Sequence, residues 1–248
     1  MRLLQRVVED PHECAYLPVE RSSLDIRIMM DVTALETESL LERGWRRFGP
    51  IYFRPVCGAC SACVSLRVDA ARFAPTKSQR RVARNVVRLR RVVGMPQVDD
   101  ERIDLYSKWH VNREAMRGWP PNSQDRNRYT LEFAYPHPCA REAAFYDDAA
   151  GGRLVGLGSF DETPGALSAA FFFHDPEYAR FSLGTANILG LLGDARRLGK
   201  QYVYLGFRVA ACQSLTYKGA FGPHELMTGR PGFDEVPVWR PNEDAAGP

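Results

Sequence analysis

The apolar runs Leu154-Val-Gly-Leu-Gly-Ser-Phe160 and Leu167-Ser-Ala-Ala-Phe-Phe-Phe173 lie past the middle of the chain, and each has the length of a β-strand. A third run, Ala143–Tyr146, precedes them. Polar, Gly-rich stretches at 147–153 and 162–166 separate the three runs and have the composition of turns. This stretch therefore predicts three consecutive antiparallel strands.

The residues that follow predict a helix and one more strand. Leu183–Leu198 has helical periodicity, with Ser182 as its predicted N-cap and Gly199 as its end. Tyr202–Phe207 is then typical of a buried strand. A meander, a helix and a strand in this order are typical of an acetyltransferase-like (GNAT) fold, which places the chain in the α+β class.

The first part of the chain alternates short strand-like runs with turns and short helices. Predicted helices are Ser39–Arg46, a basic helix from Thr76 to about Arg91, Asp99–Glu114 and Tyr129–Ala134; predicted strands are Ile51–Phe53 and Ser65–Val68. The character changes after Pro96. We therefore predict an N-terminal cysteine-containing domain (1–95), a GNAT-like domain (96–240) and a flexible tail (241–248).

Composition indicates an ordinary globular protein. The chain has 248 residues, of which 45% are hydrophobic and 25% charged, and a formal net charge of +3. No apolar run approaches the roughly 20 residues that cross a bilayer. The N-terminus carries acidic residues where a signal peptide would be apolar. These features predict a cytoplasmic protein without a membrane partner.

Three cysteines form the sharpest local motif, Cys57-Gly-Ala-Cys60-Ser-Ala-Cys63. Thiolates at this spacing can converge on one metal ion or cluster, and Cys14 is the best candidate for a fourth ligand. All-sulfur ligation suits both iron–sulfur clusters and zinc, so the residues do not decide between them. The alternative is three reduced, buried cysteines without metal.

A run of one charge sign extends from residue 70 to residue 98. It has no acidic residue and contains Arg72, Lys77, Arg80, Arg81, Arg84, Arg88, Arg90 and Arg91. A solvated helix face usually mixes charge signs, so the run predicts a polyanionic partner. The alternative is a basic face without a partner.

Two further segments have the composition of an active site. Arg180-Phe-Ser-Leu-Gly184-Thr-Ala186 opens the predicted helix, where free N–H groups favour an anion, although an ordinary Ser cap explains the segment equally well. Tyr217-Lys218 follows the predicted strand 202–207 in a loop. A buried strand that ends in polar residues is a common active-site layout. The alternative is an exposed Tyr-Lys pair without a function, which is the usual case for such a pair.

Taken together, the chain resembles the tRNA-dependent protein aminoacyltransferases, the arginyl- and leucyl-tRNA–protein transferases of N-degron pathways. The resemblance covers nearly the whole chain. It is carried, in order, by Cys14-Ala-Tyr-Leu-Pro18, Gly44-Trp-Arg-Arg47, Phe53-Arg-Pro55 with the three cysteines, Arg67-Val68, Ser78-Gln-Arg-Arg81 with Asn85, Leu154-Val155, Asp161, Asp175-Pro176, Ser182-Leu-Gly184, Tyr204-Leu-Gly206, Cys212, Tyr217-Lys218, Pro223 and Glu225.

The resemblance implies a function and partners. The compact size and the cysteine spacing resemble the bacterial branch, which transfers leucine from aminoacyl-tRNA to proteins that begin with aspartate or glutamate and so marks them for degradation; arginine transfer is the alternative. The resemblance also implies an iron–sulfur cluster in some members, ahead of zinc, at Cys14, Cys57, Cys60 and Cys63. The chemistry itself requires no cofactor, and DNA is not an expected partner.

Site roles follow from this resemblance as hypotheses. Lys218 and Tyr217 are expected near the reacting ester or the tRNA 3′ end, and Asp161 is expected to hold the substrate ammonium or to take its proton. Arginines of Gln79-Arg80-Arg81, with Arg46 or Arg47, are expected to bind the acceptor carboxylate or tRNA phosphate. The remaining predicted substrate-binding residues are Arg67, Ser182, Gly184 and Arg208.

The sequence also departs from the bacterial pattern. Phe207-Arg208-Val209 stands where Tyr-Trp-Ile is expected, Leu215 replaces a methionine, and Phe48 replaces a serine. Arg208 bears on acceptor or aminoacyl specificity. Two other functions therefore stay open: a CoA-dependent N-acetyltransferase, opposed by one extra residue between Arg180 and Gly184, and a catalytically lapsed metal-cluster protein that binds RNA or senses redox state.

Overall fold

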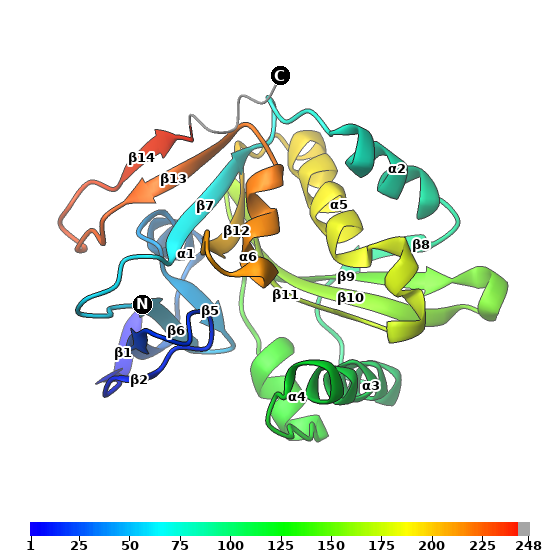
Figure 1. Cartoon of the computed structure of the whole chain (residues 1–248), viewed down its shortest axis with the longest axis horizontal. Helices are drawn as coiled ribbons and strands as arrows, with labels where there is room; N and C mark the ends of the chain where they lie inside the picture. The colour runs from blue at the N-terminus through cyan, green and yellow to red at the C-terminus, as the bar shows by residue number, and fades with distance from the viewer. Residues whose placement is uncertain (243–248) are drawn as a thin grey trace.

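The structure, a computed structural model, describes residues 1–242 (Figure 1). In this part of the chain the largest element is an eight-stranded sheet of order β14-β13-β7-β12-β11-β10-β9-β8. Its strands are β7 (Val64–Asp69), β8 (Arg90–Gly94), β9 (Ala140–Asp147), β10 (Arg153–Glu162), β11 (Ala166–His174), β12 (Tyr202–Arg208), β13 (His224–Thr228) and β14 (Val238–Pro241). Neighbouring strands are antiparallel, except that β11 and β12 run parallel.

The predicted meander, helix and strand are confirmed. β9, β10 and β11 are consecutive antiparallel neighbours, and α5 (Leu183–Arg197) leads from β11 to β12. The predicted Ser182 side-chain cap is wrong. The 3₁₀ turn η2 (Pro176–Phe181) leads directly into Ser182, which adopts a left-handed conformation (φ 53°) and not the extended one typical of a capping residue, and its side chain makes no capping hydrogen bond.

Helices cover both faces of this sheet. α5 packs on one face, where Leu191, Ile188 and Leu167 belong to one apolar cluster. α3 (Asp100–Arg117) and α4 (Arg126–Phe133) cover the other face through Trp109, Phe133 and their neighbours. The remaining short helices are α6 (Gln213–Thr216), η1 (Asp148–Ala150) and η3 (Tyr217–Ala220).

A second sheet, of order β1-β4-β6-β5, is built from the N-terminal residues. Its strands are β1 (Arg2–Val8), β4 (Leu24–Met30), β5 (Arg46–Phe48) and β6 (Ile51–Pro55); β2 (His12–Glu13) and β3 (Arg21–Ser22) form a separate hairpin. α1 (Ala34–Glu42) begins five residues before the predicted helix, because Thr33 and Glu36 form a capping box. Consequently Arg46, predicted as a helix end, lies in a strand.

The large sheet runs across the domain boundary predicted at residues 95 and 96. β7 and β8 precede this boundary but pair with β12 and β9. The basic helix α2 (Lys77–Asn85) is shorter than predicted. Residues 86–89 form a turn, and Arg90 and Arg91, predicted as helix, begin β8 on the edge of β9. Of the predicted tail, Pro241 ends β14, and 243–248 lie outside the described residues.

Within residues 1–242, no helix combines the length and the apolar composition that a bilayer span requires.

Candidate active site

The site begins where two strands of the large sheet part. β11 and β12 pair at only three positions, the last being Ser168 opposite Tyr204. Past this point β12 bulges: its register with β7 shifts between Tyr204 and Phe207, and Gly206 takes a φ of +76°. A left-handed residue in a strand bends it away from its neighbour. The bend leaves a gap in the sheet beside β11.

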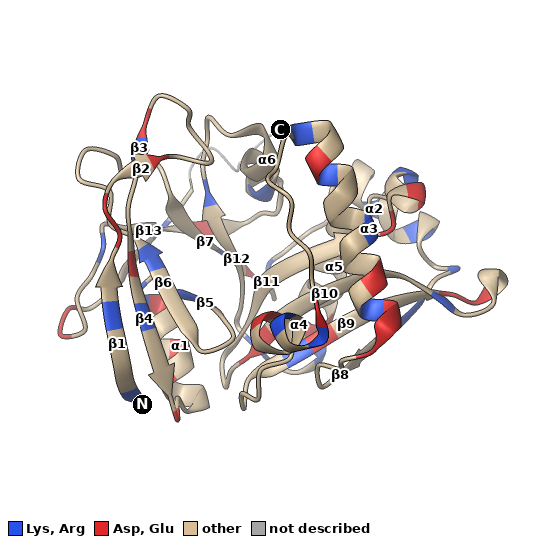
Figure 2. Ribbon diagram, turned by 90° about the horizontal axis from the view of Figure 1, so that it is seen from below, with Lys and Arg blue, Asp and Glu red and all other residues tan. Residues whose placement is uncertain are grey.

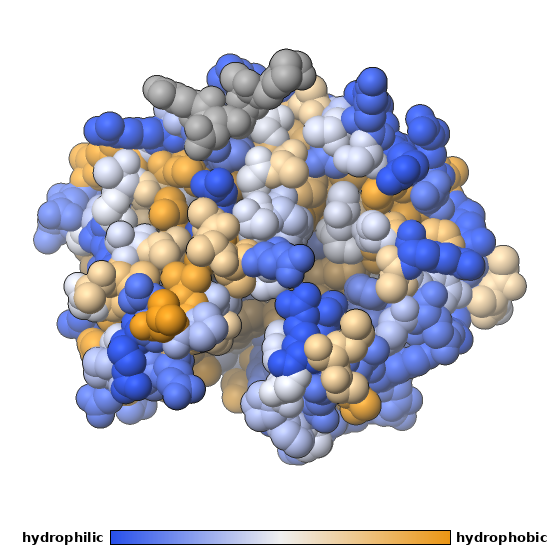
Figure 3. Space-filling view, viewed as in Figure 1, coloured by the Kyte–Doolittle hydropathy of each residue, from blue (hydrophilic) through white to orange (hydrophobic). Residues whose placement is uncertain are grey.

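A cleft of about 670 Å³ occupies this gap. Its walls come from both faces of the sheet: Ile188 lies on the α5 face and Trp109 on the α3 face. Segments far apart in sequence contribute, namely β5, the C-terminal part of α3, β11, the start of α5, β12, α6 and η3. The space-filling view shows a hollow near the centre of the molecule (Figure 3). Its volume is within the range of small-molecule binding clefts.

Arg46 is the most unusual group in the cleft. It is 7% exposed, and its Nη1 donates to the carbonyl of Trp45 at 2.8 Å, but its Nε and Nη2 are buried and have no hydrogen-bond partner. Its guanidinium lies 5.5 Å from the ring centres of Tyr204 and Phe207. Burial lowers the pKa of Arg46 to about 10, so the group is still a cation at neutral pH. A buried cation of this kind fits a carboxylate or phosphate ligand.

Lys218 lies beside this guanidinium. Its Nζ donates to the carbonyl of Phe207 at 3.0 Å, which leaves two N–H donors for a substrate. A Cβ built on Gly206 would be 3.5 Å from the Lys218 Nζ and 3.9 Å from the Arg46 Nε, so glycine opens the space between the two cations. Burial, with the nearby charge of Arg46, lowers the pKa of Lys218 to about 8.

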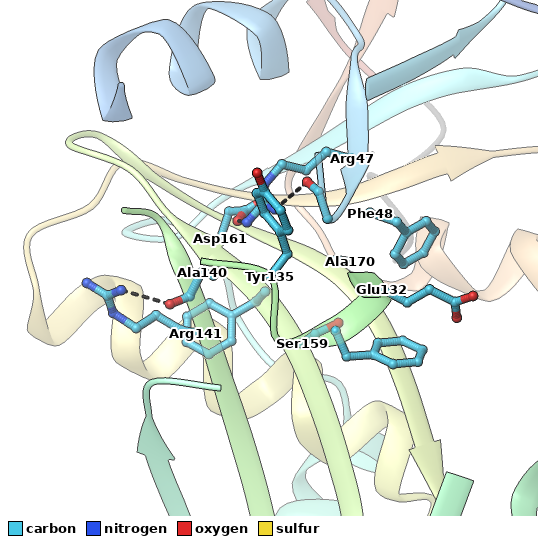
Figure 4. A pocket seen from close by; sticks show the side chains of 12 residues that line it. Arg47, Phe48, Glu132, Tyr135, Ala140, Arg141, Ser159, Asp161 and Ala170 are labelled. Carbon is cyan, nitrogen blue, oxygen red and sulfur yellow. Dashed lines mark hydrogen bonds and ion pairs between the residues drawn. The ribbon is translucent and has the colours of Figure 1, made fainter. Parts of the chain in front are cut away.

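Arg47 and Asp161 form a buried ion pair in the wall of the cleft (Figure 4). Their side chains are 9% and 6% exposed, and Arg47 also donates to the carbonyl of Gly49 at 3.0 Å. A small cavity of about 20 Å³ adjoins the pair and is lined in addition by Ser159 and Arg141. The ion pair holds the Asp161 carboxylate in place in this wall.

Aromatic and basic side chains form the α3 side of the cleft. Trp109 and Trp119 meet edge to face with ring centres 5.6 Å apart, and the Arg113 guanidinium lies 5.5 Å from the Trp109 ring centre. Arg117, one turn further along the helix, is exposed. Together with Phe171 they give this wall both apolar area and positive charge. Stacking surfaces beside cations suit an organic anion.

Asn187 and Gly184 line the cleft from the first turns of α5. Asn187 is 3% exposed, and its Oδ1 has no hydrogen-bond partner. Its carboxamide packs so closely on Gly158 of β10 that a Cβ there would meet it at 2.7 Å. Ser182, by contrast, is exposed and does not line the cleft.

The structure brings together Arg46, Arg47, Asp161, Gly184, Tyr217 and Lys218 of the predicted site residues. It places the others elsewhere. Arg67 pairs with Glu225 at 2.7 Å and lies over Tyr202, and Gln79 forms the capping box of α2. Arg80 and Arg81 are exposed on α2, and Arg208 packs against Gly219.

The four predicted metal ligands gather on one side of the molecule. Burial, with the nearby thiols of Cys57, Cys14 and Cys60, raises the pKa of Cys63 to about 12. Arg230 donates to the carbonyls of Cys57 and Cys60 at 2.9 and 2.6 Å. Within residues 1–242, however, no three Cys, His, Asp or Glu side chains are arranged so that they could hold a metal ion.

Several cleft residues escaped the sequence analysis. Trp109 was assigned to the apolar face of its helix, and Arg113, Arg117, Trp119 and Asn187 carry no local signal. They reach the site only because α3 and α5 pack on opposite faces of a parted sheet. A motif search along the chain has no access to that arrangement.

This geometry defines a cleft with buried cations on one wall and aromatic side chains on another. Comparison with known proteins identifies one protein family. The family models "Arginine-tRNA-protein transferase, N terminus" and "Arginine-tRNA-protein transferase, C terminus" match residues 12–81 and 101–228. The chain belongs to this family of aminoacyl-tRNA–protein transferases.

Its curated relatives are named consistently. An aspartate/glutamate leucyltransferase of Pseudomonas aeruginosa is 34% identical over 223 residues, which are 89% of this chain and 92% of the relative. One from Campylobacter jejuni is 29% identical over 235 residues, 92% of this chain and 95% of the relative.

Solved structures are more distant. "The structure of L-PGS from Bacillus licheniformis" has a TM-score of 0.44 at 13% identity and covers 70% of this chain and 50% of that one. "Crystal structure of FemX" has a TM-score of 0.43 at 8% identity, covering 75% and 63%.

Proposed function

We propose that the protein transfers leucine from leucyl-tRNA to the N-terminal amine of proteins that begin with aspartate or glutamate. The names of the full-length relatives support this donor and these acceptors. The observation that carries the proposal is Arg46, a buried guanidinium in the cleft with two unpartnered nitrogens. An acidic first side chain is the compact anion that would complete its hydrogen bonds.

We infer that the two reactants bind to different walls of the cleft. We assign the acceptor to the wall with Arg46, where the carboxylate binds the guanidinium and the α-amine lies toward Lys218. We assign the tRNA 3′ end to the side of Gly184 and Asn187, at the start of α5, where free N–H groups favour an anion. The meander, helix and parallel strand support a GNAT-like arrangement of this part of the chain.

The reaction replaces an ester with an amide. The neutral amine attacks the carbonyl carbon of the leucyl ester, the bond to the ribose oxygen breaks, and the amine proton leaves on that oxygen or through water. An N-terminal amine has a pKa of about 8, so roughly a tenth is neutral at pH 7. Holding amine and ester together supplies up to roughly 7–11 kcal/mol. The Lys218 ammonium can stabilise the oxyanion, a contribution of about 3–4 kcal/mol.

Leucine fits this cleft better than arginine. The walls are rich in aromatic residues, including Phe171, Phe172 and Phe207. Among the residues that form the cleft in the described chain, the single carboxylate is Asp161, and Arg47 already binds it. An arginyl side chain would therefore find apolar and cationic neighbours. Because charged tRNA is made in the cytoplasm, we place the reaction there; its product would enter an N-degron pathway.

The deciding experiment supplies total aminoacylated tRNA and peptides that begin with each amino acid, and identifies products by mass spectrometry. We expect leucine on peptides beginning with Asp or Glu, and little product on the Asn and Gln peptides of the same shape. Arginine in the products would correct the donor. No transfer from any charged tRNA by folded protein would contradict the proposal and favour a lapsed paralogue.

A further inference from the structure

The short helix α2 has two sharply different sides. Lys77, Arg80, Arg81 and Arg84 follow the spacing i, i+3, i+4, i+7 and therefore share one face. All four are exposed. The opposite face carries Gln79, Val82 and Val86 and packs toward α5. We call the four cations the α2 stripe.

The stripe lacks the counter-ions that the last three arginines of this basic run possess. Arg88, Arg90 and Arg91 pair with Asp147, Asp148 and Asp194. No ion pair to the stripe occurs within residues 1–242, where Arg80 donates only to the carbonyl of Pro75. Over most of the molecule basic and acidic residues are mixed (Figure 2), whereas α2 has no acidic residue.

This arrangement is unfavourable for the helix alone. Lys77 and Arg81, like Arg80 and Arg84, are like charges four residues apart, which repel. Lys77 also lies in the first turn, at the positive end of the helix dipole. A plain solvated face would gain from one or two glutamates here. The stripe is therefore organised for an external polyanion.

Its place in the fold links the stripe to the donor side of the cleft. Val82 and Val86, beneath the stripe, share an apolar cluster with Leu183 and Ala186 of α5. Gly184 and Asn187, in the same turns of α5, line the cleft. The stripe and this part of the cleft therefore lie on two neighbouring helices that pack against each other. A nucleic acid whose double-stranded part lies on α2 can pass its single-stranded 3′ end over the start of α5.

We propose that the α2 stripe is the docking surface for the double-stranded acceptor stem of the charged tRNA. The inference rests on the proposed function and extends it from the reacting end to the body of the donor. From Lys77 to Arg84 the stripe is about 10 Å long, enough for on the order of three phosphates. Its contacts are to the backbone, so they fix position and carry no base sequence.

The test compares two donors and two variants. The first variant, Lys77→Gln, Arg81→Gln, Arg84→Gln, removes three charges of the α2 stripe. Glutamine is a good helix former, so α2 should be preserved. The matched control removes three exposed charges elsewhere, as Arg2→Gln, Arg126→Gln, Arg240→Gln, with the same change in net charge. Each is assayed with leucyl-tRNA and with leucyl-CCA trinucleotide, which lacks the stem, over a series of salt concentrations. Circular dichroism melting checks that both variants fold.

The stripe variant should raise KM for leucyl-tRNA by tenfold or more at moderate salt. It should flatten the plot of log(kcat/KM) against log(salt) by about 2 in slope, roughly 0.7 to 0.9 for each lost phosphate contact. Transfer from leucyl-CCA should stay within twofold of wild type. An unchanged KM and slope with leucyl-tRNA, or equal losses with both donors or in the control, would overturn the proposal. Failure of the proposed function looks different: the wild type would then use neither donor.

Discussion

Replacing Arg46 with methionine separates binding of the acceptor from stability of the fold. Methionine keeps much of the side-chain volume over Tyr204 and Phe207 and removes the buried charge. If Arg46 binds the acidic side chain, the loss is that of one partner of a buried charge pair, which costs about 2–5 kcal/mol. A middle value of about 3 kcal/mol corresponds to roughly 150-fold in kcat/KM.

The assay measures kcat/KM for peptides that begin with Asp, Glu, Asn or Gln. In the wild type we expect discrimination between Asp and Asn of roughly two orders of magnitude. In Arg46→Met the rate with Asp should fall to that with Asn, and the rate with Asn should change little, because the isosteric amide gains nothing from the cation.

Stability should change in the opposite direction. Two nitrogens of Arg46 are buried without a partner in the free protein, so methionine should stabilise the fold by about 1–3 kcal/mol in urea unfolding. Arg54→Met is the matched control. Arg54 is half-buried, lies over Trp45 and donates to the Pro231 carbonyl at 2.7 Å, but it does not line the cleft. The reasoning is refuted if Arg46→Met, correctly folded, still prefers Asp over Asn, or if Arg54→Met loses that preference equally.

Three further predictions concern neighbouring groups. Burial and the charge of Arg46 lower the pKa of Lys218 to about 8, against a smaller opposite effect of Cys212 and Cys63. We expect kcat/KM to rise with pH as the acceptor amine becomes neutral, and to fall above pH 8 as Lys218 loses its proton. In a pH profile of Lys218→Met the fall above pH 8 should be absent. Gly206→Ala should lower kcat/KM more than tenfold, because the new methyl group lies between the two cations, and should cost about 1–2 kcal/mol of stability, because φ is +76°. Gly199→Ala is the control, since φ is +68° there and the space around it is open. It should lose the same stability and keep its kcat/KM. Burial lowers the pKa of His137 to about 4, from about 6.5 in the unfolded chain. The free energy of unfolding should therefore be constant above pH 6.5 and fall by about 3 kcal/mol between pH 6.5 and 4, because only the unfolded chain binds the proton in that range. Urea unfolding of His137→Phe should not show this fall.

The meander and α5 were predictable because their information is local. Each predicted apolar run lies within one strand of the meander, and α5 ends within one residue of the prediction, before Gly199. β8 was not predictable in the same way. Arg90 and Arg91 were predicted as the end of the basic helix, but they pair with β9 as the start of a strand. Long-range pairing overrides local propensity at that point.

The residues of the candidate site likewise fall into those with a local sequence signal and those that depend on contacts distant in sequence. Tyr217 and Lys218 were found because they follow a buried strand, and both line the cleft. Arg46 was named with Arg47, but its burial depends on pairing with Phe53 and on Tyr204, which is distant in sequence. The basic run looked uniform, yet the fold pairs Arg88 with Asp147 and leaves the α2 stripe exposed. Charge partners are a tertiary property, so composition alone could not separate the two groups.

The last prediction concerns Asp161, because an acid in a cleft is the obvious candidate for a proton acceptor. Its carboxylate is buried and bound by Arg47, whereas the reacting ester is already activated and part of the amine is already neutral. We therefore expect Asp161→Asn to cost about 3 kcal/mol of stability, through the charge left on Arg47, and to lower single-turnover transfer by less than tenfold. The double variant Arg47→Met, Asp161→Asn should recover part of that stability, because no buried charge remains. A loss of transfer beyond a thousandfold in folded Asp161→Asn, without a shift in KM for the acceptor, would make Asp161 the base and Arg47 the group that orients it.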